Sequence, residues 1–80
     1  MGKNILIVDD SESIREVVSF TLKNEGYNVM IGNDGTDALE FFDGTQIDLV
    51  ITDLHMPEMN GIELIKQIRE KEQYKRIPIL

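Results

Sequence analysis

Two apolar segments of this sequence end in carboxylates that could bind a cation. Asp9 and Asp10 directly follow the apolar residues 5–8, and Asp53 directly follows residues 48–52. If the two segments are neighbouring strands, their ends lie about 4.8 Å apart and the carboxylates share one pocket. Two unit charges about 4 Å apart repel by about 4 kcal/mol at an effective dielectric near 20, so raised pKa values, a lysine or a divalent cation must offset them. Oxygen ligands accompanied by water suit Mg²⁺, which would also neutralise an incoming phosphoryl group.

Acidic residues at strand ends can instead cap the helix that follows. This alternative explains Asp9 and Asp10 as well as a metal site does. Asp53 is different, because the sequence Met-Pro-Glu at residues 56–58 separates it from the next helix, and Pro57 disfavours helical geometry at Met56. The sequence therefore predicts that Asp53 is held at a strand tip by a defined turn.

Composition excludes several other kinds of site. The chain contains no cysteine and a single histidine, His55, which excludes disulfides, thiolate chemistry and a histidine-cluster metal site. Its formal net charge of -7 disfavours nucleic-acid binding, which depends on Lys and Arg. No apolar run approaches the ~20 residues that span a bilayer, and Asp9 interrupts the first run too early for a signal peptide. We therefore expect a cytoplasmic protein that contacts neither nucleic acid nor membrane.

Strands and helices must alternate to position the carboxylates. Continuous apolar patterns predict strands buried on both faces at residues 5–8 and 48–52, as in a parallel sheet. The half-polar residues 27–31 predict an edge strand, and residues 77–80 begin a fourth strand.

Helices are predicted in the three gaps between these strands. The first begins at Ser11 or at the capping box of residues 13–16, two alternatives that the sequence leaves open, and Gly26 ends it. A turn at residues 33–35 precedes the second helix, and Asn60 with Glu63 forms a cap pair for the third. Each helix is predicted to turn one stripe of side chains inward. The stripe is Ile14, Val17, Val18, Thr21 and Leu22 in the first helix, Ala38, Leu39 and Phe42 in the second, and Ile62, Leu64, Ile65 and Ile68 in the third.

The resulting order, β-α-β-α-β-α-β, indicates an α/β fold with a parallel sheet, right-handed crossovers and helices on both faces. Ligands of such sheets bind at the carboxyl ends of the strands, where the acidic residues lie. The chain has 80 residues, so we expect a single domain, residues 1–80.

Several segments resemble response-regulator receiver domains. Ile-Leu-Ile-Val-Asp-Asp at residues 5–10 is similar to the opening strand of that family. Residues 53–61 resemble its phosphorylation loop, with Asn60 where Asp is commoner. Residues 33–40 resemble the entry to its second helix, and residues 77–79 the start of its fourth strand. The resemblance covers all 80 residues.

The resemblance implies a three-layer, flavodoxin-like open parallel sheet, of which this chain supplies the β-α-β-α-β-α-β portion. The strand order would be 2-1-3-4-5, the order known for the chemotaxis regulator of that family. Asp53 would be the phosphoacceptor. Asp10, Asp53 and the backbone carbonyl of His55 would ligate Mg²⁺ directly, and Asp9 would act mainly through water. A histidine kinase or a small acyl phosphate would donate the phosphoryl group, and the domain would regulate an output rather than act as an enzyme.

Family members continue through a fourth helix, a fifth strand and a fifth helix, and these supply a Ser or Thr, an aromatic residue and a Lys that find no match here. Because positioned charge dominates phosphoryl-transfer catalysis, we expect the 80-residue chain to be phosphorylated slowly. We also expect self-association, most simply two-fold, because the sheet edge at residues 77–80 and bare apolar sheet surface would be exposed.

Two other functions are possible. One is a phosphohydrolase with an aspartate nucleophile, although its usual motif is Asp-x-Asp, whereas Asp9 and Asp10 are adjacent here. Turnover of a phosphate monoester would identify it. The other is a truncated or engineered receiver fragment with a structural, self-associating role and little phosphotransfer, which is compatible with the family resemblance.

Overall fold

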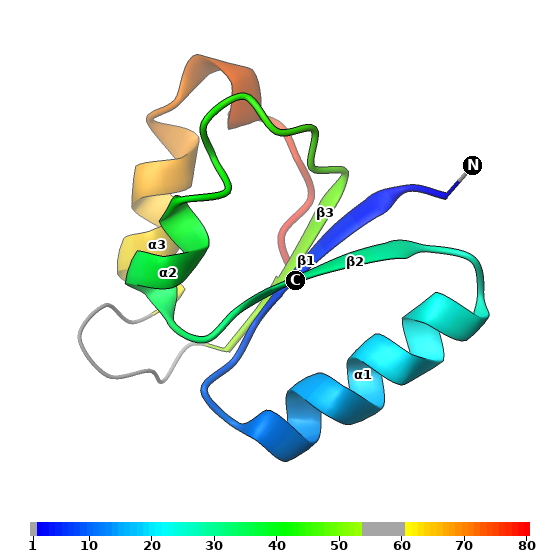
Figure 1. The fold of residues 1–80 in the computed structure, drawn as a ribbon. Helices are drawn as coiled ribbons and strands as arrows, with labels where there is room; N and C mark the ends of the chain where they lie inside the picture. The colour runs from blue at the N-terminus through cyan, green and yellow to red at the C-terminus, as the bar shows by residue number, and fades with distance from the viewer. Residues whose placement is uncertain (1, 54–60) are drawn as a thin grey trace.

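A computed structural model of the chain describes residues 2–53 and 61–80, in which strands and helices alternate (Figure 1). The elements are β1 (Asn4–Val8), α1 (Glu12–Asn24), β2 (Asn28–Gly32), α2 (Gly35–Leu39), β3 (Leu49–Thr52), α3 (Gly61–Arg69) and the short 3₁₀ helix η1 (Glu72–Tyr74). The three strands form one parallel sheet in the order β2-β1-β3. This order confirms the predicted parallel α/β sheet and the edge position of the half-polar strand.

Strand β1 lies at the centre of the sheet and pairs along its length with both neighbours. Ile7, for example, lies opposite Ile31 of β2 and Ile51 of β3. Strand β1 begins one residue before the predicted strand, at Asn4, and β2 ends one residue after it, at Gly32. Backbone pairing therefore continues past the residues from which the strands were predicted. The predicted fourth strand is reduced to a single parallel bridge between Val50 and Ile79, which lies beside β3 as the expected order requires.

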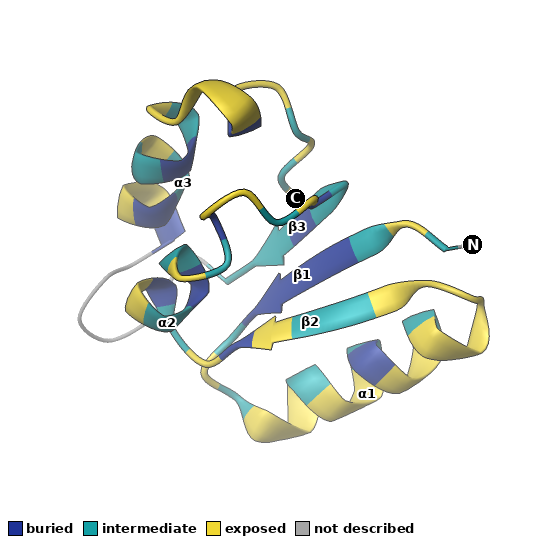
Figure 2. Cartoon of the chain, turned by 45° about the horizontal axis from the view of Figure 1, so that its top comes forward, coloured by how far each residue is buried: buried dark blue, intermediate teal, exposed yellow. Residues whose placement is uncertain are grey.

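The two faces of the sheet are covered by different helices. Alternate side chains of a strand point to opposite faces. Leu6 and Val8 pack into a core formed with α2 and α3, and the members of this core are Leu6, Val8, Ala38, Phe42, Ile47, Val50, Leu64, Ile68 and Tyr74. Ile5 and Ile7 are buried on the opposite face, where α1 lies (Figure 2). These two faces confirm the predicted three layers.

Tyr74 closes the core at the amino-terminal edge of the sheet. Its hydroxyl donates to the carbonyl of Thr45 at 2.7 Å and accepts from the N–H of Gly44 at 3.0 Å, and its ring packs edge-on against Phe42 with centroids 4.8 Å apart. Phe42 is buried although it lies beyond the end of α2. The helix η1, which carries Tyr74, was not predicted, because its three residues are too few to show a hydrophobic period.

The start of α1 decides between the two predicted caps. Ser11 is the N-cap, and its side chain accepts a hydrogen bond from the N–H of Ile14 at 3.4 Å. Ser13 therefore lies inside the helix, and the capping box at residues 13–16 is wrong.

The predicted inward stripe of α1 is also partly wrong. Ile14, Val17 and Thr21 are exposed, whereas the covered residues are Arg15, Val18, Ser19 and Leu22. These four follow helical spacing, so the buried stripe is narrower than predicted and rotated away from Ile14 and Val17. The rotation brings Arg15, a charged residue, toward the sheet. In α3 the same kind of correction applies to Ile62, which is exposed, whereas Leu64 and Ile68 are buried as predicted.

Helix α1 carries a row of exposed apolar side chains. Val17 is 65% exposed and Phe20 is 67% exposed, and the β3 residues Leu49 and Ile51, on the α1 face of the sheet, are only half-buried. An open pocket of about 340 Å³ adjoins Leu49, and it is lined by Lys3, Ile5, Leu22, Tyr27, Asp48 and Leu49. Exposed apolar side chains of this kind favour association. Within residues 2–53 and 61–80, no helix is long and apolar enough to cross a membrane.

Asp48 ties the amino-terminal ends of β1 and β3 together. Its Oδ2 accepts from the N–H of Asn4 at 2.7 Å, its Oδ1 accepts from Nε2 of Gln46 at 3.3 Å, and its N–H donates to the carbonyl of Asn4 at 2.8 Å. The hydrogen bond from the Asn4 backbone, then that from Gln46, and the charge of Lys3 hold the pKa of Asp48 below its ordinary value of 3.8. Sequence analysis gave Asp48 no such role.

We predict that the 80-residue chain self-associates through the exposed row on α1. Light scattering over a range of concentrations should show a dimer at high micromolar chain. Val17→Lys and Phe20→Lys should each weaken the dimer by about tenfold or more, because burying such a side chain contributes about 1.5–3 kcal/mol. Ile62→Lys removes another exposed apolar residue, which lies on α3, and should leave association unchanged. A monomer at every concentration would contradict the prediction.

We predict that Asp48 makes the fold sensitive to acid. Because the folded-state pKa lies below the unfolded-state value near 4, the ionised carboxylate contributes stability above pH ~4, and this contribution disappears as the pH falls through the folded-state pKa. Asp48→Asn should therefore flatten the fall in the free energy of unfolding between about pH 5 and pH 3, measured by urea unfolding. Glu70→Gln, an exposed change of the same charge, should keep the wild-type slope. An unchanged slope for Asp48→Asn would refute this role.

Candidate functional site

Asp9 and Asp53 occupy the same level at the carboxyl edge of the sheet. Val8 lies opposite Thr52 in the register of β1 and β3, so the next residues are Asp9 and Asp53. The N–H of Asp53 donates to the carbonyl of Val8 at 2.9 Å, and the N–H of Asp9 donates to the carbonyl of Gly32 at 3.3 Å. Both residues are therefore attached to the sheet through their backbones.

The backbone of Asp53 is held on its other side as well. Its carbonyl accepts a hydrogen bond from Oγ1 of Thr52 at 3.0 Å. This contact gives the Thr52 side chain a structural role at the end of β3.

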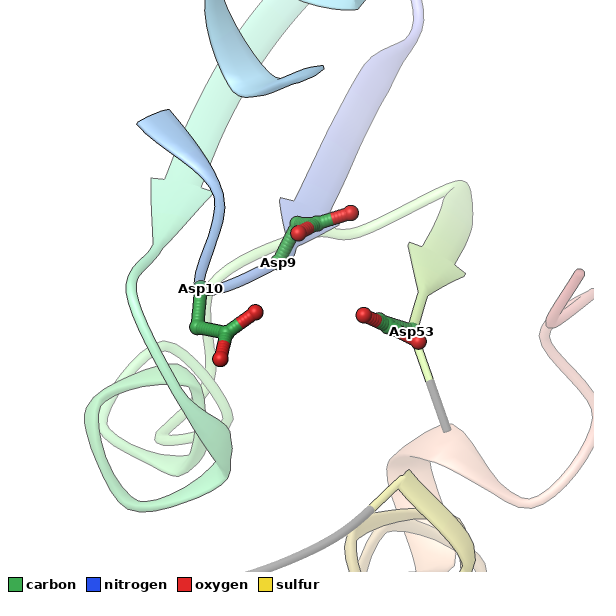
Figure 3. A group of neighbouring side chains, drawn as sticks. All are labelled: Asp9, Asp10 and Asp53. Carbon is green, nitrogen blue, oxygen red and sulfur yellow. The ribbon is translucent and has the colours of Figure 1, made fainter. Parts of the chain in front are cut away.

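A short turn after β1 brings in the third carboxylate. Oδ1 of Asp9 accepts from the N–H of Ser11 at 2.8 Å, which closes the turn around Asp10. Asp9, Asp10 and Asp53 then each offer a carboxylate oxygen, and these oxygens lie within 4.8 Å of one another. In Figure 3 the carboxylates of Asp10 and Asp53 point toward one another across a gap, and Asp9 lies above it.

The structure thus brings together the three carboxylates that the strand ends were expected to bring together. The capping alternative does not account for Asp10, because the cap of α1 is Ser11. Asp9 does stabilise the turn, so it has a structural contact in addition to its place in the cluster. His55, the fourth predicted ligand, lies outside the described residues, as do Pro57 and Asn60.

The cluster is open to water. Asp10 is exposed, whereas Asp9 and Asp53 are half-buried. At the 4.8 Å limit of the cluster, a pair of ionised carboxylates repels by about 1 kcal/mol in bulk water and about 3.5 kcal/mol at an effective dielectric near 20. A hard cation that keeps part of its water shell would offset this repulsion. The oxygen-only donor set and the solvent access therefore fit Mg²⁺.

Arg15 is a site residue that sequence analysis missed. From the first turns of α1, its Nη1 donates to the backbone carbonyl of Asp9 at 2.8 Å. A basic residue near the start of a helix is usually expected to be exposed to solvent. The one signal in the sequence was that Arg15 follows Asp10 by five residues.

The response regulator receiver domain matches this chain over residues 5–80. The chain belongs to this family. Chemotaxis protein CheY-3 of Vibrio cholerae is 42% identical over 83 residues, in an alignment that covers all of this chain and 64% of CheY-3. This receiver domain therefore spans less than two thirds of the length of that relative.

Solved structures confirm the flavodoxin-like fold of the receiver. Chemotaxis response regulator CheY4 of Vibrio cholerae superposes with a TM-score of 0.95 at 43% identity, over 99% of this chain and 66% of that chain. Response regulator TrrA of Thermotoga maritima, solved in complex with Mg²⁺–BeF, superposes with a TM-score of 0.82 at 41% identity, over 89% of this chain and 62% of TrrA.

TrrA also appears in a complex with the histidine kinase ThkA. In that structure the TM-score is 0.86 at 40% identity, over 96% of this chain and 65% of that chain. Relatives of this receiver are thus known both with a magnesium-containing ligand and with a kinase.

We predict that replacing Asp10 relieves repulsion in the cluster and removes its response to Mg²⁺. Without metal, Asp10→Asn should raise the thermal midpoint by a few degrees. With Mg²⁺ tenfold above its Kd, the wild-type free energy of unfolding should increase by about 1.4 kcal/mol, and that of Asp10→Asn should not change. Calorimetry with and without Mg²⁺ measures both effects. Glu16→Gln, an exposed charge change on α1, should keep the wild-type response. An Asp10→Asn variant with an undiminished response would argue against the site.

Proposed function

We propose that this receiver domain accepts a phosphoryl group on Asp53 in a Mg²⁺-dependent step of a two-component phosphorelay. The observation that carries the proposal is the convergence of Asp9, Asp10 and Asp53 at the carboxyl edge of the sheet. Family membership supports it, because receiver domains are the regulatory modules of two-component systems.

In the proposed step, one carboxylate oxygen of Asp53 attacks the phosphorus of the donor. A P–O or P–N bond of the donor breaks as the new O–P bond forms, and the product is an aspartyl phosphate. Asp53 is suited to the role of nucleophile because its backbone is fixed by Val8 and Thr52 while its carboxylate faces the open gap. A fixed nucleophile matters because phosphoryl transfer depends mainly on positioning and charge.

Asp10 and Asp53 would hold Mg²⁺ directly, together with the backbone carbonyl of His55, and Asp9 would contribute through water. The cation supplies the positive charge that an approaching phosphoryl group needs in a pocket of carboxylates. The Mg²⁺–BeF complex of TrrA supports this assignment by analogy, since 41% of the aligned residues are identical.

The proposed donor is a histidine kinase or a small acyl phosphate. The complex of TrrA with a histidine kinase supports the first of these. We propose that residues 1–80 act as one regulatory domain in the cytoplasm, controlling a downstream output and turning over no substrate. The exposed apolar row on α1 supports self-association as a further property of the chain.

We predict that Asp53→Asn abolishes labelling by a radioactive small acyl phosphate in the presence of Mg²⁺. The wild-type label should be lost in mild alkali, because an aspartyl phosphate is an acyl phosphate. Asp43→Asn, an exposed aspartate outside the cluster, should be labelled like the wild type. A stable label on a Ser or Thr, or equal labelling of Asp53→Asn, would refute the assignment. A phosphate monoester should not be hydrolysed, and turnover would favour the phosphohydrolase.

A further inference from the structure

Arg15 contacts the acidic cluster through the backbone. Its Nη1 donates to the carbonyl oxygen of Asp9 at 2.8 Å, and the residue is half-buried. We propose that Arg15 is a positioning residue for the Mg²⁺ site, acting through the peptide that joins Asp9 to Asp10. This inference rests on the proposed function.

The carbonyl of Asp9 belongs to the peptide unit that fixes the start of Asp10. Because a peptide unit is planar, a hydrogen bond that orients the carbonyl also orients the nitrogen and Cα of the next residue. On the other side of Asp10, the N–H of Ser11 is bound by Oδ1 of Asp9. Asp10 is therefore held from both sides through its backbone, although its side chain is exposed.

The two bonds act on the same turn. The bond from Ser11 closes a ring that contains the Asp9–Asp10 peptide, and the bond from Arg15 adds a second constraint by fixing the carbonyl of that peptide from outside the ring. In Figure 3 the side chain of Asp10 extends from this turn toward Asp53. A rotation of the Asp9–Asp10 peptide would redirect that side chain away from the gap.

The charge of Arg15 and its hydrogen bond act on Mg²⁺ in opposite directions. A guanidinium near the site repels a divalent cation, so loss of the charge alone would raise the affinity for Mg²⁺. Loss of the positioning bond would lower it, and partners that orient metal ligands typically change affinity by about tenfold or more. The sign of the change therefore distinguishes the two effects.

The test is Mg²⁺ titration of the 80-residue chain, followed by the amide NMR signals of residues 9, 10 and 53. Arg15→Gln should weaken Mg²⁺ binding by about tenfold, as expected for loss of an orienting partner, while the Mg²⁺-free thermal midpoint falls only slightly. Arg15→Lys keeps the charge without the planar fork of donors and should fall between Arg15→Gln and the wild type. Lys23→Gln removes the same charge from the last turn of α1 and should bind Mg²⁺ like the wild type.

Wild-type or tighter binding by Arg15→Gln would overturn the inference. If Arg15→Gln does not fold, Arg15→Lys decides: weaker binding supports the inference, and wild-type binding overturns it. Asp10→Asn separates this result from the proposed function. If Asp10→Asn also binds Mg²⁺ normally, the metal site itself is wrong. If only Arg15→Gln binds normally, the site stands and Arg15 has no positioning role.

Discussion

The parallel pairing of β1 with both of its neighbours is the constraint on which the site depends. Because β1 is aligned with β2 on one edge and with β3 on the other, the residues that leave these strands emerge at the same level. The N–H groups of Asp9 and Asp53 continue the two ladders by one more bond each. The sheet thereby holds the carboxylates of Asp9 and Asp53 close together despite their like charge. The central strand is buried on both faces, and the burial of Leu6 and Ile7 stabilises this arrangement.

Much of this arrangement could be predicted from the sequence. Residues 5–8 are apolar without interruption, which is the pattern of a strand covered on both sides, and the half-polar β2 is an edge strand. The carboxylates follow directly from the strand ends. Assignment of Mg²⁺ and phosphoryl chemistry to them depends on the family resemblance as well, since acidic clusters alone are common on protein surfaces.

Other features depend on tertiary contacts, which the hydrophobic periodicity of a segment does not predict. The orientation of α1 could not be read from Ile14 and Val17, because the helix is rotated so that Arg15 and Leu22 face the sheet. Tyr74 likewise binds Thr45, which lies 29 residues away in the sequence, and Asp48 binds Asn4, which lies 44 residues away. The choice of Ser11 over Ser13 as the cap was open because both residues are followed by suitable helical sequence.

Ser11 has two contacts that make the site and the start of α1 one cooperative unit. Its N–H binds the carboxylate of Asp9, and its hydroxyl caps the helix at Ile14. Fraying of the first turn of α1 therefore releases the turn around Asp10, and disorder in that turn removes the cap. By thermodynamic linkage, any ligand that orders the carboxylates suppresses helix fraying, and any molecule that orders the start of α1 strengthens the binding of that ligand by the same factor.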